Sequence, residues 1–161
     1  ASGSRYEAIP SNAPLEPLGP YACSKAASFV ALHGLAIEKK IKLSYLRIFS
    51  TYGKGQHKSN LWPSLYESAV SGNDYPMTMG EQIRDFISVE DVVDEFVNNL
   101  LFDKVILGIP MIKNIGTGKP LTVREFSEYW WNKLGAKGEL QIGKIPYRKN
   151  EVMRFVPEIL P

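Results

Sequence analysis

Helix-like and strand-like segments alternate along most of this chain, and the alternation limits the folds that it can adopt. Residues 21–40 carry apolar side chains at helical spacing, and the largely apolar run 43–49 follows as a buried strand. Further helix patterns cover residues 60–71, 89–102 and 122–134, and further strand-like segments cover residues 77–79, 86–89 and 105–114. Alternation of this kind predicts an α/β fold.

Polar residues mark the starts of two of these helices. Ser88 precedes one helix pattern and Asp91 lies three residues later, while Thr122 and Glu125 have the same spacing at another. A hydroxyl cap whose partner acid reaches back satisfies amide groups that a helix start leaves unpaired. We therefore expect caps at Ser88 and Thr122, and we interpret Asp91 as a cap or an arginine partner rather than as a catalytic acid.

The composition is that of an ordinary globular domain. The 161 residues are 44% hydrophobic, and the formal net charge is +2 with 17 acidic residues interspersed. This charge is too small to indicate a nucleic-acid partner, and no apolar run reaches the roughly 18 residues of a membrane span. The single cysteine, Cys23, excludes an internal disulfide, and neither His33 nor His57 pairs with acidic residues at metal-binding spacing. We expect a cytoplasmic domain without a membrane segment or a metal.

Tyr21 and Lys25 form the most informative local pattern, because they are four residues apart on the expected helix. At this spacing the two side chains are neighbours on one helix face, where an ammonium can stabilise a phenolate that transfers protons. Ser2, in the cluster Ser2-Gly3-Ser4, could bring a hydroxyl to the same place. A tyrosine and a lysine at this spacing also occur by chance on helix surfaces, so the pair alone leaves both interpretations open.

Further motifs along the chain favour the chemical interpretation. The first two after the Ser2 cluster are Pro20–Ala27, which contains Pro-Tyr-x-x-Ser-Lys, and Leu46–Gly53, which reads Leu-Arg-x-x-Ser-x-Tyr-Gly. They are followed by Gly80–Asp91, which contains Arg-Asp-Phe, and then by Asn114–Gly118 and Arg148–Glu151. In this order the motifs resemble those of the extended short-chain dehydrogenase/reductase family. Its members include nucleotide-sugar epimerases, dehydratases and 4-ketoreductases.

The resemblance implies the C-terminal part of a Rossmann-like doubly wound parallel sheet plus a small α/β substrate-binding domain. Residues 1–58 would end the Rossmann-like domain, and residues 59–161 would mainly bind substrate, with a strand and helix near 85–116 returning to the sheet. The sequence contains no Gly-x-x-Gly-x-x-Gly or Gly-x-Gly-x-x-Gly turn for a dinucleotide pyrophosphate. We therefore expect a longer enzyme in which about 100 or more residues precede this chain, since each strand-helix-strand unit takes about 30.

The resemblance also implies roles for residues at the catalytic end. Tyr21 would be the general acid/base, Lys25 would assist it and hold the nicotinamide ribose, and Ser2 would hydrogen-bond the same substrate oxygen. Tyr21, Lys25, Phe49 and Ser50 would contact the cofactor, which would be NAD or NADP in the complete enzyme. No residue is expected to bind a metal.

A nucleoside-diphosphate sugar would be the substrate. Arg84 and Arg148 would bind its diphosphate, because arginine offers a permanent charge and several donors. Asn60 and Leu61 would add backbone donors at a helix start, and Met77 would lie where the base sits. The complete enzyme is expected to be a homodimer.

Departures from the family pattern narrow the activity. Gly3-Ser4 follows Ser2, where 4,6-dehydratases carry acidic residues, so a 4-ketoreductase or an epimerase is favoured over a dehydratase. Ser50 replaces a frequent asparagine, and Glu7 replaces a frequent glycine. A non-catalytic protein that binds a nucleotide sugar or a partner stays open as an alternative, although Ser2, Tyr21 and Lys25 are intact.

Two other features have structural interpretations. Asp85, inside the Arg-Asp-Phe motif, is expected to order its loop rather than to perform chemistry. Trp130 and Trp131 are expected to pack and partly cover a surface rather than to stack on a nucleobase. Neither feature is needed for the proposed reaction.

Overall fold

The computed structural model describes residues 5–159 and has an α/β architecture. Its helices are α1 (Pro20–Glu38), α2 (Leu61–Ser71), α3 (Val89–Asn99) and α4 (Val123–Lys133). Its strands are β1 (Ser44–Ile48), β2 (Ser50–Tyr52), β3 (Tyr75–Pro76), β4 (Ile83–Ser88), β5 (Met111–Ile115), β6 (Pro120–Thr122), β7 (Leu140–Gln141) and β8 (Arg154–Phe155). The predicted α/β class is confirmed.

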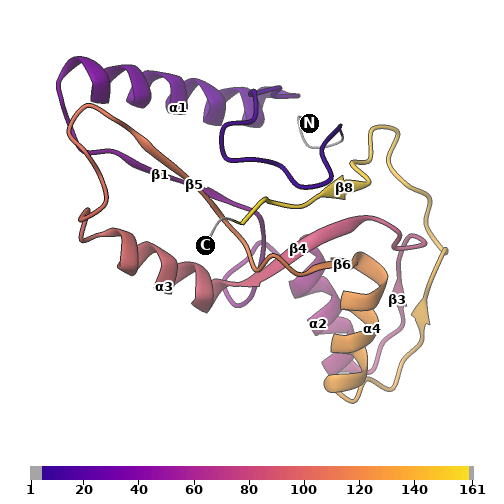
Figure 1. Ribbon diagram of the computed structural model, residues 1–161. Helices are drawn as coiled ribbons and strands as arrows, with labels where there is room; N and C mark the ends of the chain where they lie inside the picture. Colours follow the sequence, from indigo (N-terminus) through magenta and orange to yellow (C-terminus); the bar gives the residue numbers. More distant parts are fainter. Residues whose placement is uncertain (1–4, 160–161) are drawn as a thin grey trace.

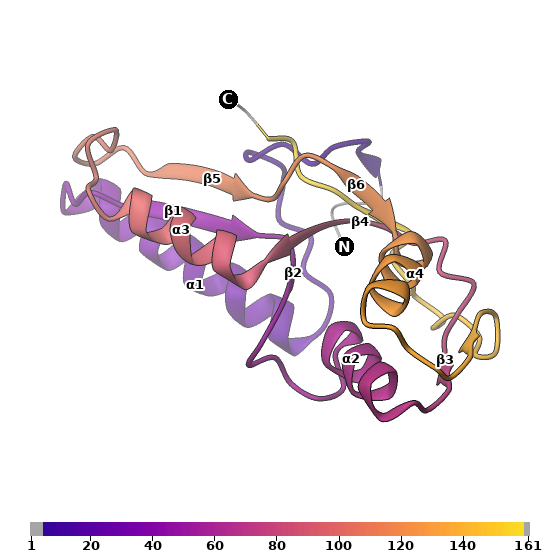
Figure 2. The ribbon, with the colours of Figure 1, turned by 90° about the horizontal axis from the view of Figure 1, so that it is seen from below.

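One end of the molecule is a parallel pair, β1 and β5, that lies between α1 and α3 (Figures 1 and 2). The two faces of β1 alternate, as the pleat of a strand requires. Tyr45 faces α1, where its ring centroid lies 4.5 Å from that of Phe29. Leu46 packs on the other side, against a buried cluster that contains Val92 of α3 and Ile115 of β5. The pair is therefore covered on both faces, as parallel strands usually are.

The other end is built around β4. This strand pairs with β2 and β8 in parallel and with β6 in antiparallel orientation. Helices α2 and α4 lie together beside these strands (Figure 1), and Leu65, Ala69 and Trp131 form their shared core. Trp131 is buried and Trp130 packs against this core, which confirms that the two tryptophans pack. Only Phe49 separates β1 from β2, so the chain passes directly from one group of strands to the other.

The expected caps of α3 and α4 are present. The Ser88 hydroxyl accepts a hydrogen bond from the Asp91 amide at 3.0 Å and donates to the Asp91 carboxylate at 2.7 Å. At α4 the Thr122 hydroxyl accepts from the Glu125 amide at 3.0 Å, while the Glu125 carboxylate accepts from the Thr122 amide at 2.7 Å. The hydrogen bonds that the Glu125 carboxylate accepts from the Thr122 amide and from the Thr122 hydroxyl lower the pKa of this carboxyl. Both helices thus begin where the sequence predicts.

One strand prediction was wrong in position. Residues 77–79 do not form a strand, and the Thr78 hydroxyl accepts instead from the Gly80 amide at 3.2 Å. Pairing occurs instead at β3, just before this segment, and the partner of β3 is the distant β7. The strand expected within residues 105–114, ending at Gly116, is present as β5. It begins at Met111, after a stretch with hydrogen bonds from Val105 to Phe102 and from Ile109 to Ile106.

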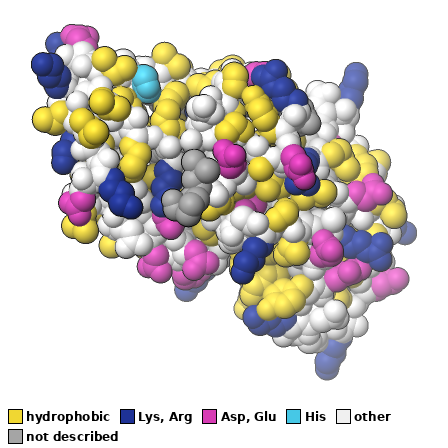
Figure 3. All heavy atoms as spheres, in the orientation of Figure 1, with side chains coloured by type: hydrophobic (Ala, Val, Ile, Leu, Met, Phe, Trp, Pro, Cys, Tyr) yellow, Lys and Arg dark blue, Asp and Glu magenta, His cyan; other side chains and the backbone are white. Residues whose placement is uncertain are grey.

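Helix α1 is unusually exposed for so apolar a helix. Of its residues, only Ala36 is buried. Large apolar side chains lie on its surface, and they are Tyr21, Val30, Leu32, Leu35 and Ile37. Figure 3 shows hydrophobic side chains gathered over this end of the molecule. A helix that is apolar on most sides is normally covered by other protein.

Within residues 5–159, no helix combines the length and the apolar character that crossing a membrane takes. The same residues contain no cluster of three or more His, Cys, Asp or Glu side chains arranged to hold a metal ion.

Candidate functional site

One cavity, which we call the arginine cavity, gathers residues that are far apart in the sequence. It has a volume of about 370 Å³ and lies beside β2 and the start of α2. The predicted residues on its wall are Ser50, Asn60, Leu61, Arg84 and Arg148. The fold therefore brings both predicted diphosphate arginines to one place, together with the helix start that was expected to join them.

The start of α2 leaves amide groups available to this cavity. Asn60 is the N-cap residue, but its side chain makes no capping hydrogen bond. The first amides of a helix have no partner within the helix, and with the helix dipole they favour a negative group at this position. The wall of the arginine cavity thus combines these amides with two cations.

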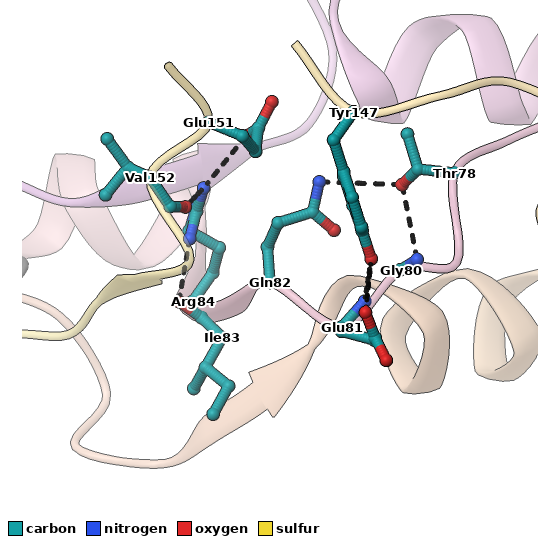
Figure 4. Close-up of polar contacts among 9 residues, drawn as sticks. All are labelled: Thr78, Gly80, Glu81, Gln82, Ile83, Arg84, Tyr147, Glu151 and Val152. Atoms are coloured by element: carbon teal, nitrogen blue, oxygen red, sulfur yellow. Dashed lines mark hydrogen bonds and ion pairs between the residues drawn. The ribbon is translucent and has the colours of Figure 1, made fainter. Parts of the chain in front are cut away.

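The Arg84 side chain already makes hydrogen bonds and an ion pair within the protein (Figure 4). Its guanidinium donates to the Ile83 and Val152 carbonyls and lies 3.5 Å from the Glu151 carboxylate. Burial lowers the pKa of Arg84, and the Glu151 carboxylate acts against that shift. Arg84 therefore joins the 147–155 segment to β4 as well as lining the cavity.

Arg148 is differently placed. It is exposed and lies on a turn closed by a 3.1 Å hydrogen bond from the Glu151 amide to the Arg148 carbonyl. Its guanidinium has no hydrogen bond or ion pair with any residue in the described range 5–159. Judged by the contacts among residues 5–159, Arg148 is therefore the cation of this cavity that is free to bind an anion from solution.

Aromatic residues complete the arginine cavity, and none of them was among the predicted site residues. They are Tyr52, Trp62, Phe86 and Phe126. Their rings contact one another, with Phe86 stacked on Phe126 at 3.9 Å and Tyr52 edge-on to Trp62 at 5.5 Å between centroids. Burial raises the pKa of Tyr52, with a further contribution from Asp91. Tyr52 and Phe86 lie inside the recognised motifs, so only Trp62 and Phe126 lacked a local signal.

A second cavity, the tyrosine cavity, has a volume of about 540 Å³. Tyr21, Lys25 and Phe49 lie on its wall. The Lys25 ammonium is 5.6 Å from the centroid of the Tyr21 ring, and 76% of Tyr21 is exposed. The predicted pair therefore lies side by side on α1 and is open to a ligand. Ser2 lies outside the described residues.

The 147–155 segment contributes to both cavities. It supplies Arg148 to the arginine cavity, and it supplies Asn150, Val152 and Phe155 to the tyrosine cavity. The Phe155 ring stacks on Phe49 at 4.6 Å between centroids. The two cavities therefore adjoin at Phe49 and Ser50, which are consecutive residues that line one cavity each.

Asn114 connects β5 with two other segments of the chain through its side chain. Its amide nitrogen donates to the Ile9 carbonyl at 2.7 Å and to the Glu158 carbonyl at 3.1 Å. The Asn114 side chain is buried on the wall of the tyrosine cavity, and its amide oxygen has no partner among the described residues. Because both hydrogens of the nitrogen are used, the oxygen is left as an acceptor.

Met77 is not brought to either cavity. It is buried, with 3% of its surface exposed. Its amide donates to the Gln141 carbonyl and its carbonyl accepts from the Ile145 amide. The predicted role of Met77 at the base therefore has no support from its position, which is away from both cavities.

Asp85 has the structural role that the sequence predicted. The side chain is fully buried and accepts hydrogen bonds from the Thr117 amide, the Thr117 hydroxyl and the Gly118 amide at 2.7 to 2.8 Å. A side chain at Gly116 would lie 2.9 Å from the Asp85 carboxylate, so glycine is required for this close approach. Asp85 thus orders the turn after β5.

The chain is similar to known proteins of one family. The profile of the "NAD dependent epimerase/dehydratase family" matches residues 3–104, more than half of the chain. The CDP-abequose synthase of Salmonella typhimurium is 28% identical over 137 residues, which are 83% of this chain and 46% of that protein. A putative UDP-glucose 4-epimerase of Methanocaldococcus jannaschii is 29% identical over 160 residues, 96% of this chain and 49% of that protein.

The fold is similar to that of solved structures. The UDP-glucose 4-epimerase of Thermotoga maritima, solved with UDP-glucose, has a TM-score of 0.81 at 25% identity. The alignment covers 98% of this chain and 51% of that one. The chain spans about half the length of the curated relatives that it matches.

Proposed function

Because this chain belongs to the NAD dependent epimerase/dehydratase family, we propose that the complete protein is an NAD(P)-dependent nucleotide-sugar epimerase or 4-ketoreductase. The observation that carries the proposal is the convergence of Arg84 and Arg148 on one cavity at a helix start. Two relatives are named for nucleoside-diphosphate sugars, a CDP sugar and a UDP sugar. The relatives do not decide between the two activities, and the absence of an acidic pair after Ser2 disfavours a dehydratase.

We propose that the two parts of the chain, divided after residue 58, have different roles. Residues 1–58 contribute the catalytic end of the Rossmann-like domain, and residues 59–161 mainly bind the substrate. The pairing of β5 with β1 supports the proposed return of the chain near 85–116 to the first sheet. The exposed apolar surface of α1 supports further protein contacts in the complete enzyme, such as those of a homodimer. We also propose that the complete enzyme is cytoplasmic.

Proton transfer is assigned to α1. Tyr21 gives a proton to, or takes one from, an oxygen of the sugar, and Lys25 stabilises the phenolate form. Ser2 is proposed to donate a hydrogen bond to the same oxygen. When bound, the cofactor supplies the hydride acceptor and donor for the sugar carbon.

The tyrosine cavity fits the nicotinamide end of such a cofactor. Its volume of about 540 Å³ lies in the usual range for small-molecule sites. Its wall is mostly apolar, with the Lys25 cation and the unpartnered Asn114 amide oxygen among its polar groups. Tyr21, Lys25 and Phe49 are the residues proposed to hold the cofactor here, whereas Ser50 lies on the substrate side. The glycine turn that would hold the pyrophosphate is not among the 161 residues.

Replacing Arg148 with alanine tests the substrate assignment. Hydrogen bonds to charged groups contribute about 1.5 to 3 kcal/mol each, so Arg148→Ala should weaken nucleoside-diphosphate binding roughly 10-fold to 150-fold. Calorimetry with UDP, CDP, GDP and dTDP measures the effect. Arg84→Ala should weaken binding at least as much, because it also releases the Val152 carbonyl. The double variant should fall short of additivity, since both side chains act on one group.

A matched control separates this contact from general charge. Lys149 is the neighbouring exposed cation and does not line the arginine cavity. Lys149→Ala should therefore leave binding within about 2-fold of the parent at moderate salt, where exposed charges are screened. The nucleotide-sugar assignment is wrong if Arg148→Ala binds every nucleoside diphosphate as the parent does.

A non-catalytic nucleotide-sugar binding protein of the same fold is the alternative function. It shares the arginine cavity, so binding measurements do not separate the two. The open position of Tyr21 beside Lys25 favours the enzyme, because a binding protein does not need a proton donor there. Turnover of a nucleotide sugar by the complete protein with NAD(P) distinguishes the alternatives.

A further inference from the structure

The turn that carries Arg148 is fastened at both of its ends to the strand β4 and the residues just before it. On the far side of the turn, Arg84 binds the Val152 carbonyl and Glu151, and the Ile83 amide donates to the Met153 carbonyl at 2.7 Å. On the near side, Tyr147 provides the attachment (Figure 4). The turn itself is otherwise an exposed loop.

The Tyr147 hydroxyl makes two hydrogen bonds to the same residue. It accepts from the Glu81 amide at 3.1 Å and donates to the Glu81 carboxylate at 3.0 Å. The two contacts use both the donor and an acceptor position of the hydroxyl. Tyr147 is separated from Glu81 by a long stretch of sequence, so this contact depends on the fold and has no local sequence signal.

The anchor that Tyr147 binds is itself fixed. Gly80, just before Glu81, has a φ of +71°, and a side chain there would lie 2.7 to 2.9 Å from Arg124 atoms. The Gly80 carbonyl accepts from the Arg124 amide at 2.9 Å, which attaches the segment before β4 to α4. A segment that is fixed in this way can hold the Tyr147 hydroxyl in one place.

We propose that Tyr147 is a positioning residue for Arg148. Through its contacts with Glu81, Tyr147 holds that arginine at the arginine cavity. The proposal rests on the proposed function, because it assumes that Arg148 binds the diphosphate. An exposed arginine on a loop pays conformational entropy when it is fixed by a ligand. Fastening the backbone on both sides of Arg148 reduces that cost before the ligand arrives.

The test measures nucleotide binding with and without the Tyr147 hydroxyl. Tyr147→Phe keeps the ring and removes both hydrogen bonds. From the usual contribution of such bonds, we expect it to weaken binding of UDP, CDP, GDP or dTDP, whichever the parent binds most tightly, about 3-fold to 10-fold. In an Arg148→Ala background the same change should alter affinity by less than about 2-fold, because the group that Tyr147 positions is gone.

Matched variants identify the contact. Glu81→Gln keeps an oxygen that accepts from the Tyr147 hydroxyl and should bind nearly as the parent does, whereas Glu81→Ala should weaken binding as Tyr147→Phe does, to a smaller extent. Tyr129→Phe also removes an exposed tyrosine hydroxyl, one that accepts from Lys133, and should have no effect. If Tyr147→Phe weakens the parent and the Arg148→Ala variant by equal factors, Tyr147 acts on the whole fold and the proposal is wrong.

A measurement without ligand separates this proposal from the proposed function. The Glu151 amide closes the Arg148 turn, so its hydrogen exchange reports how well the turn is held. Tyr147→Phe should speed this exchange roughly 3-fold to 10-fold and leave the Asp91 amide at the start of α3 unchanged. Unchanged exchange at Glu151 overturns the positioning role. Failure of the parent to bind any of the four nucleotides overturns the proposed function instead.

Discussion

Tyr21→Phe in the complete enzyme is expected to lower kcat by a factor on the order of 10² to 10⁴, the usual effect of losing a general acid/base. The ring stays, so contacts of Tyr21 with the wall of the tyrosine cavity are retained, and only the proton-transferring hydroxyl is lost. Nucleoside-diphosphate affinity should hardly change, since the arginine cavity is lined by other residues. Steady-state turnover of the nucleotide sugar with NAD(P), together with calorimetry of the nucleotide, separates the two effects.

Two further variants make this test specific. Lys25→Ala should lower turnover and also weaken cofactor binding, because Lys25 is assigned to both the phenolate and the nicotinamide ribose. Tyr129→Phe removes a hydroxyl from an exposed tyrosine on α4 and should retain full activity. Near-normal turnover of Tyr21→Phe removes Tyr21 from the reaction and leaves the binding-protein alternative as the better interpretation.

The proximity of Tyr21 and Lys25 could be predicted because it is local. Tyr21 and Lys25 are one helical turn apart, so a helix over that segment suffices to make them neighbours. The caps at Ser88 and Thr122 could be predicted for the same reason, since each depends on a residue only three positions away. Local spacing does not show what such residues face, and the tyrosine cavity appears only in the structure.

The arginine cavity was predicted only through the family resemblance. Nothing in the sequence spacing places Arg84 beside Arg148, and their meeting depends on β8 pairing with β4. Trp62, Phe126 and Tyr147 have no local pattern that distinguishes them from core or surface residues. The resemblance gave no indication that Arg84 is already bound to Val152 and Glu151.

The strands that were missed are those whose pairing is distant. β3 and β7 each have two residues and are held by partners far along the chain, so no alternation of apolar and polar residues marks them. Thr78 shows the reverse case, where a β-favouring residue lies outside every strand and its hydroxyl accepts from the Gly80 amide. Short strands are thus decided by long-range contacts and side-chain hydrogen bonds more than by propensity.

Asp85→Asn is expected to reduce the free energy of unfolding by about 3 to 5 kcal/mol, because hydrogen bonds to a charged acceptor contribute about 1.5 to 3 kcal/mol each. The carboxylate is fully buried and accepts from three donors, two on Thr117 and one on Gly118. An asparagine of nearly the same shape replaces one acceptor oxygen with an NH₂ group. That group would face a donor, and the buried donor would lose its partner.

Urea unfolding of the two proteins measures this difference. Asp94→Asn is the control, because Asp94 is exposed on α3 and surface changes of this kind are usually within about 0.5 kcal/mol. A change below about 1 kcal/mol for Asp85→Asn contradicts the structural role. The turn after β5 then has other support, and the aspartate beside Arg84 becomes a candidate for chemistry after all. A large loss of unfolding free energy instead means that the motif Arg84-Asp85-Phe86 has two roles, on alternate faces of β4. Arg84 and Phe86 line the arginine cavity, whereas the Asp85 carboxylate stabilises the core.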